Sequence, residues 1–207
     1  HKFRCTRMTR DFFISTTGVQ PVHVRRLERS DETALRDAIA TFSNRTRYLR
    51  FFSGMPVVPE PVLHRLADVD GDLHQAWAAF IDGADGEKIV GAVHAMRSST
   101  DEAEADLAIG LVDDWQGKGL SRTLVALLAN EALTKGITTF NADVLWENKP
   151  GRALMKALGA VSTGNSGSVI SYRIDLSQLL SGFGEKRGQA TAKSIARFAR
   201  TPEAAAA

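Results

Sequence analysis

A short glycine turn between an apolar strand and an amphipathic helix limits the folds that this chain can adopt more than any other feature does. The turn reads Gln-Gly-Lys-Gly-Leu-Ser at residues 116–121, and it follows a strand-like segment that ends at Val112. Leucines at helical spacing then continue to Lys135, and Gly136 follows as the predicted C-cap. Unpaired backbone N–H groups and the positive end of the helix would meet in this turn. The turn therefore predicts a binding site for an anion.

The residues of the turn suit a phosphate group. Glycine at 117 and 119 lets a phosphate approach the backbone without a Cβ in the way, and Lys118 adds a cation. Two other phosphate-binding loops fit worse. A P-loop needs a glycine at Val112 and a serine or threonine at Gly119, whereas a dinucleotide fingerprint needs a third glycine at Arg122 and a preceding parallel βαβ unit. A glycine-rich turn that binds nothing is the plain structural alternative.

Length and composition set further limits. A chain of 207 residues suits one well-buried domain with a tail. Its 26 Lys and Arg residues nearly balance its 24 Asp and Glu residues, which does not indicate a nucleic-acid partner. The single cysteine forms no intrachain disulfide, no Cys/His spacing matches a metal site, and no apolar run reaches the roughly 18 residues that span a bilayer. We expect a cytoplasmic protein without a metal or a membrane partner, as a monomer or homodimer.

The order of elements indicates a mixed α/β fold in one domain. Predicted strands lie at 22–27, 75–81, 89–96, 105–112, 140–145 and 169–176. Predicted helices follow Ser30-Asp31, cover 43–52, follow Pro61, and cover 120–135 and 149–158. This order predicts a central mixed sheet with helices on both faces. We expect an N-terminal extension at 1–20, the domain at 21–180, and a basic, mobile C-terminal tail at 181–207.

Together these features resemble the GNAT superfamily of N-acetyltransferases. The coenzyme motif Q/R-x-x-G-x-G/A of that family is met by Gln116, Gly119 and, with one small departure, Ser121. Its later Asn-containing helix start is matched by residues 146–150, and the resemblance extends over about residues 22–176. It implies a mostly antiparallel sheet that splays open beside the strand before the turn, with acetyl-CoA as co-substrate. In motif the chain is most similar to the bacterial protein-lysine acetyltransferase branch.

The same resemblance implies how the coenzyme lies. The strand end would hold the pantetheine arm, the turn would hold the pyrophosphate, and an asparagine would face the coenzyme near its sulfur. A backbone N–H of the strand, expected to be that of Val112, would meet the negative charge that develops on the thioester oxygen. The expected coenzyme-binding residues are Gly110, Leu111, Val112, Gln116, Gly117, Lys118, Gly119, Leu120, Ser121 and Asn148.

Acetyl transfer requires a neutral amine, and a lysine-like amine is mostly protonated at neutral pH. A general base is therefore expected, and the protein-acetylating branch places it ten residues before the motif glutamine, at Asp106. A glutamate is usual there. The shorter aspartate would act through water, or the role falls to Glu104 on the same strand face. The plain alternative is that both are solvated strand-edge carboxylates. The family's tyrosine that protonates the leaving thiolate is missing, because residues 153–155 are Ala-Leu-Met.

The acceptor would enter over the helices after the first strand. Tyr48, Arg50 and Phe51 belong to a run that looks like a segment of bacterial protein-lysine acetyltransferases, so we expect them to contact the acceptor. The alternative is a purely structural role, in which the apolar residues of this run pack in the core and its arginines are solvated. His94, on a central strand, is interpreted as a packed histidine. We expect a protein lysine ε-amine as acceptor, with a small-molecule amine, or a coenzyme A-binding sensor without turnover, as alternatives.

Overall fold

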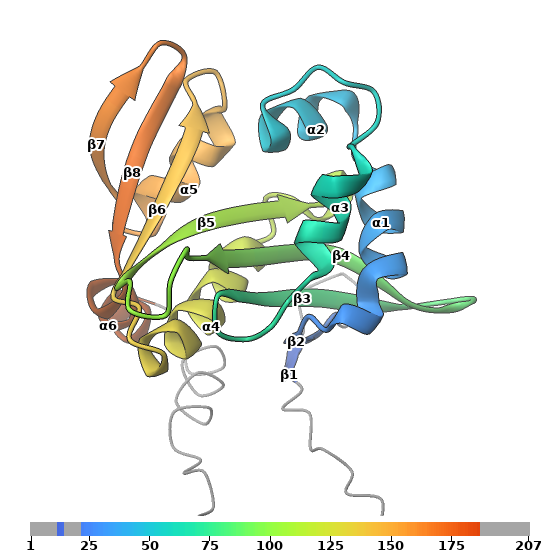
Figure 1. Cartoon of the computed structure of the whole chain (residues 1–207), viewed down its shortest axis with the longest axis horizontal. Coiled ribbons are helices and arrows are strands. Elements are labelled where there is room, and N and C mark those ends of the chain that lie inside the picture. Colours follow the sequence, from blue (N-terminus) through green and yellow to red (C-terminus); the bar gives the residue numbers. More distant parts are fainter. Residues whose placement is uncertain (1–11, 15–21, 187–207) are drawn as a thin grey trace, which may run out of the picture.

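A computed structural model describes residues 12–14 and 22–186 of the chain. These residues form one eight-stranded sheet in the order β1-β2-β3-β4-β5-β6-β8-β7. Neighbouring strands are antiparallel, except that β5 and β6 run parallel. Helices cover both faces of the sheet (Figure 1), which confirms the predicted mixed α/β fold with a mostly antiparallel sheet.

The strands are β1 (Phe12–Ile14), β2 (Val22–Arg26), β3 (His74–Gly83), β4 (Gly86–Met96), β5 (Glu104–Leu111), β6 (Thr139–Leu145), β7 (Val161–Ser166) and β8 (Val169–Asp175). The helices are α1 (Glu32–Ala40), α2 (Asn44–Phe51), α3 (Glu60–Ala67), α4 (Leu120–Thr134), α5 (Lys149–Ala157) and α6 (Leu176–Lys186). Two single-turn 3-10 helices, η1 (Arg29–Asp31) and η2 (Asp113–Trp115), precede α1 and the glycine turn. None of the described helices is both long and apolar enough to cross a bilayer.

Besides the two 3-10 helices, three of these elements are absent from the sequence-based prediction. Strand β7 is polar and all six of its residues are exposed, so it shows no apolar alternation. Strand β1 lies within the predicted N-terminal extension, and α6 runs to Lys186, past the predicted domain end at residue 180. The remainder of the predicted extension and of the predicted tail lies outside the described residues.

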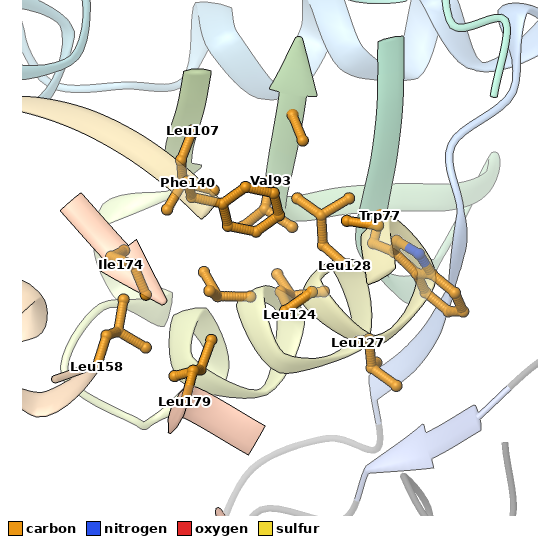
Figure 2. Close-up of a cluster of buried hydrophobic side chains, with 14 of the residues drawn as sticks. Trp77, Val93, Leu107, Leu124, Leu127, Leu128, Phe140, Leu158, Ile174 and Leu179 are labelled. Atoms are coloured by element: carbon orange, nitrogen blue, oxygen red, sulfur yellow. The ribbon is translucent and has the colours of Figure 1, made fainter. Parts of the chain in front are cut away.

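Helix α4 forms the larger core beneath the sheet. Leu124, Leu127 and Leu128 are at most 1% exposed, and Figure 2 shows them beside Trp77 and Phe140 of the strands. Burying each such side chain contributes about 1.5–3 kcal/mol. On the opposite face α1 and α3 pack a second cluster against β3 and β4. The two central strands are thus buried from both sides, which explains their continuous apolar runs.

The start of α1 differs from the sequence-based prediction. Asp31 holds the N-cap position, but its side chain makes no capping hydrogen bond to the helix. Its carboxylate instead accepts two hydrogen bonds from Arg25, at 2.7 and 2.8 Å, and one from the backbone N–H of Glu28, at 2.8 Å. The predicted cap therefore joins α1 to β2, because a paired guanidinium binds a carboxylate more strongly than a single N–H does.

We expect Leu128→Ala to lower the free energy of unfolding by about 2–5 kcal/mol, because it leaves a cavity between α4 and the sheet. Denaturant unfolding measures this loss. Leu73→Ala is the matched control, since Leu73 is 36% exposed, and it should lower the free energy by less than about 1 kcal/mol. Equal effects of the two changes would contradict the position of the core.

Candidate functional site

The parallel ladder between β5 and β6 is short. It extends over three residue pairs and ends where Asp106 pairs with Asn141. Beyond that point β5 stays paired with β4 as far as Leu111, while β6 stays paired with β8 as far as Leu145. The two strands diverge in Figure 1. Past Asp106, the edge of β5 that faces β6 therefore has no partner strand among the described residues.

The β4–β5 ladder determines which backbone groups of β5 face this opening. The N–H of Val112 donates to the carbonyl of Val90 at 2.9 Å. Antiparallel pairs alternate between hydrogen-bonded and non-hydrogen-bonded, so with this register residues 108 and 110 also bond to β4. The N–H and C=O groups of Ile109 and Leu111 consequently point toward the opening.

This alternation of hydrogen-bonded pairs changes the roles expected for the backbone groups at the end of β5. The prediction that the Val112 N–H meets the thioester oxygen is wrong, because that N–H already donates within the sheet. Ile109, which the sequence analysis did not name, takes its place as a candidate donor. The backbone of Gly110 also bonds to β4. Its missing Cβ instead makes room for the ring of Phe42, whose Cζ lies 3.3 Å from where a Cβ would stand.

The glycine turn has a backbone shape that favours glycine. Gly117 and Gly119 have φ angles of 72° and 81°, which L side chains rarely adopt. Gly119 is the N-cap of α4, and within the described part of the chain no side chain caps the first turn of the helix. The N–H groups of residues 120–122 are therefore left for an external acceptor. The Nζ of Lys118, 5.1 Å from the ring of Trp115, adds positive charge beside them.

Two side chains join this turn to α2. Gln116 donates from Nε2 to the carbonyl of Leu111 at 3.2 Å and to the hydroxyl of Thr46 at 3.1 Å. Asp113 accepts from the N–H and hydroxyl of Ser43, at 3.0 and 2.7 Å, and from Thr46 at 2.8 Å. Burial raises the pKa of Asp113, but these hydrogen bonds outweigh it, so the pKa lies below its ordinary value. The N-terminus of α2 is thereby fixed at the strand–turn junction.

The three predicted acceptor-binding residues lie on α2 in different surroundings. A hydrogen bond to Glu147, in the loop before α5, raises the pKa of the Tyr48 phenol and links α2 across to β6. Arg50 lines a cavity together with His94, and burial lowers its pKa to about 10. Arg50 has no carboxylate within ion-pair distance among the described residues. Phe51 packs against the second core cluster, which matches the plain structural alternative for that residue.

The two candidate bases also differ. Glu104 accepts hydrogen bonds from Asn141 at 2.8 Å and from Arg173 at 2.6 Å, and these contacts lower its pKa. A carboxylate held in this way is a weak proton acceptor. Partial burial, followed by the charges of neighbouring carboxylates, raises the pKa of Asp106. The structure therefore makes Asp106 the stronger base of the two.

Asn148 has a structural role in the described fold. Its Oδ1 accepts the N–H of Gly151 at 2.9 Å and so caps the start of α5, at the end of β6. Beside it Trp146 is 60% exposed, with the guanidinium of Arg152 4.4 Å from its ring centroid. The predicted coenzyme-facing asparagine therefore lies at the rim of the opening, held by a helix cap.

Comparison with known proteins gives three informative similarities. The chain is 33% identical over 138 residues to Acetyltransferase Pat of Mycolicibacterium smegmatis. The aligned region covers 65% of this chain and 40% of that relative. The chain thus spans about two fifths of the length of this relative. The GNAT domain of S. lividans PAT superposes with a TM-score of 0.73 at 22% identity, over 80% of this chain and 97% of that one.

A spermidine N-acetyltransferase from Vibrio cholerae, solved in complex with CoA and spermine, has the same fold. Its TM-score is 0.59 at 20% identity, over 77% of this chain and 98% of that one. The family model of the Acetyltransferase (GNAT) domain matches residues 22–161, which is more than half of the sequence. The chain therefore belongs to the GNAT acetyltransferase family, and this segment is an acetyl-CoA-dependent acetyltransferase domain.

Proposed function

We propose that this domain holds acetyl-CoA across the opening between β5 and β6 and transfers its acetyl group to a protein lysine ε-amine. The observation that supports it is the early end of the β5–β6 ladder at Asp106, which leaves the last five residues of β5 without a β6 partner on the way to the glycine turn. The unpaired backbone N–H groups at the edge of β5 are consequently followed along the chain by those at the N-terminus of α4. A pantetheine arm with amide groups and a pyrophosphate match those two sets of donors.

The coenzyme would be bound mainly by backbone groups. The amides of the pantetheine arm pair with the N–H and C=O of Ile109 and with the N–H of Leu111, as an added strand would, because the Leu111 carbonyl already accepts from Gln116. The pyrophosphate accepts from the N–H groups that begin α4, with Lys118 near its charge. Because the donors are fixed by the fold, they need no reorganisation when the coenzyme binds.

Asp106 would remove the first proton from the acceptor ammonium, directly or through a water. A carboxylate with a raised pKa holds that proton better than an ordinary one. The neutral amine then attacks the thioester carbonyl carbon, and the Ile109 N–H stabilises the charge on the oxygen. Glu104 is disfavoured as base because Arg173 and Asn141 already use its oxygens.

A protein acceptor is favoured by the surface that flanks the opening. After α2 the chain exposes Phe52, Met55 and Val57 at 43%, 54% and 71%, and Trp146 stands near the opposite rim. Exposed apolar side chains around a site are typical of a macromolecular partner. A small polyamine is the second candidate, because the Vibrio cholerae enzyme of the same fold was solved with spermine.

We expect Gly119→Val to weaken acetyl-CoA binding by at least about a hundredfold, because a β-branched residue is strained at this φ and its side chain stands where the pyrophosphate would lie. Isothermal titration calorimetry measures the loss. Gly136→Val is the matched control, since Gly136 has φ 79° just beyond the other end of α4. The control should lose stability but keep its affinity. Unchanged binding by Gly119→Val would place the coenzyme elsewhere.

Asp106→Asn should lower kcat/KM about 10²-fold while acetyl-CoA affinity stays the same, because an amide accepts no proton. In the wild type, activity should fall as pH drops through the raised pKa of Asp106, since protonation removes the base. This acid limb should disappear in the variant. Thiol release between pH 3.5 and 9, a range that begins below the ordinary pKa of an aspartate, measures both effects, with Glu104→Gln as the control that keeps the limb. Wild-type activity of Asp106→Asn would contradict the assignment.

The same thiol assay tests the acceptor. A lysine-containing peptide or protein should be acetylated with a higher kcat/KM than spermidine. A preference for spermidine would overturn the protein acceptor while leaving the transferase reaction standing. Coenzyme binding without turnover on either acceptor would overturn the reaction and favour a coenzyme-binding sensor.

A further inference from the structure

Two histidines form a buried pair beside the proposed acyl position. His74 of β3 and His94 of β4 are 7% and 3% exposed, and the Nε2 of His74 lies 3.0 Å from the Nδ1 of His94. His94 is directly opposite Ala108 of β5, the residue before Ile109. Its ring also lines the cavity to which Arg50 contributes. The pair thus lies one strand away from the candidate oxyanion donor.

The hydrogen-bond partners determine which ring nitrogens carry protons. The Nδ1 of His74 lies 3.2 Å from the backbone carbonyl of Asp68, which only accepts hydrogen bonds, so this Nδ1 carries a proton. In the neutral ring the Nε2 of His74 is then an acceptor, and His94 must donate to it from Nδ1. Among the residues that the structure describes, the Nε2 of neutral His94 has no hydrogen-bond partner, so its lone pair is free.

The surroundings keep both rings neutral near pH 7. Burial lowers the pKa of His74 and lowers that of His94 well below its ordinary value. The charges of His74, when protonated, and of Arg50 lower the pKa of His94 further. The charged groups around the pair are Arg50 of α2, Arg65 of α3, Asp68 and Asp70 of the loop before β3, and Asp106 of β5, two residues from Ala108 on the same strand.

We propose that His94 carries a proton from the attacking nitrogen to the coenzyme sulfur, an inference that rests on the proposed function. After Asp106 has taken the first proton, the amine nitrogen bonds to the carbonyl carbon and becomes acidic. The Nε2 of His94 accepts its second proton. The C–S bond breaks with both electrons on sulfur, and the imidazolium returns the proton to the thiolate. The products are an amide and the free thiol, and the proton held by Asp106 passes to water.

Two features of the structure fit this shuttle. His94 is paired with Ala108 in the β4–β5 ladder, where Cα atoms of a hydrogen-bonded pair lie about 5.5 Å apart, and it lines the same cavity as Gly110, the residue after Ile109. An imidazolium whose pKa is strongly lowered also gives up its proton readily. The shuttle supplies the acid that the sequence lacks on α5, where Ala153 and Leu154 stand in place of a tyrosine. His74 is a positioning residue that fixes the tautomer.

The first test is His94→Asn. The amide nitrogen of asparagine replaces Nδ1 and keeps the hydrogen bond to His74, but nothing replaces the lone pair at Nε2. We expect kcat to fall about 10²-fold with unchanged acetyl-CoA affinity and an unchanged acid limb from Asp106. A kcat within twofold of wild type would overturn the proposal and leave His94 as a packed residue.

The second test separates positioning from simple packing. His74→Gln replaces Nε2 by an oxygen that still accepts from His94, whereas His74→Leu removes the acceptor at similar bulk. We expect His74→Gln to keep most of kcat and His74→Leu to lose about tenfold or more, with its pH profile shifted. Equal losses in the two variants would contradict the role of His74.

The third test measures the protonation of the histidine rings in the wild-type protein, so it does not depend on whether a variant folds. The ¹⁵N chemical shifts of the histidine rings at pH 7 should show His94 protonated on Nδ1 and unprotonated on Nε2. A proton on Nε2 would overturn the shuttle whatever the kinetics. Failure of the proposed function is recognised separately, because the wild type would then bind acetyl-CoA without acetylating any amine.

Discussion

The parallel ladder between β5 and β6 ends after three residue pairs, and the whole site depends on that end. While two strands stay paired, their backbone groups bind each other and nothing else. Once they separate, the N–H and C=O groups of Ile109 and the N–H of Leu111 need another partner, while the carbonyl of Leu111 accepts from Gln116. The helix that follows starts without a side-chain cap at Gly119 and adds a second group of unpaired donors. A long, polar ligand with a terminal pyrophosphate suits this path.

Contacts from distant parts of the chain hold the opening in shape. Asp113 and Gln116 fasten α2 at one end, through Ser43 and Thr46. Tyr48 reaches Glu147 and links α2 to the β6 side. The acceptor side and the coenzyme side are therefore coupled mechanically, because the residues that shape the glycine turn also position α2. The charge on Asp113 matters here, since a carboxylate accepts three hydrogen bonds that a neutral amide could not all match.

Local patterns in the sequence predict much of this fold. The spacing of leucines predicts α4, and the glycines of the turn are required by their positive φ angles. Strand β7 is not predictable in this way, because it is an exposed edge with no buried face to impose alternation. The role of Val112 is not predictable either, because it depends on the register with β4, which only the folded sheet determines.

The catalytic residues show the same division between local and distant information. The resemblance to the family places the base at Asp106, with Glu104 on the same strand face as the alternative. The structure separates them because Arg173 arrives from β8 and binds Glu104, a pairing with no signature in either segment. The bond between His74 and His94 likewise exists only because β3 and β4 are neighbours. An isolated histidine on a central strand is reasonably interpreted as packed, and only its partner reveals a free lone pair.

The most direct test is a titration of the ¹⁵N-labelled protein with acetyl-CoA, followed by amide NMR. We expect the largest shifts at Ile109, at Leu111 and at residues 117–122, with little change at Gly110 and Val112, whose N–H groups bond to β4. Shifts that avoid the glycine turn, or that are as large for the even-numbered as for the odd-numbered residues of β5, would contradict this expectation.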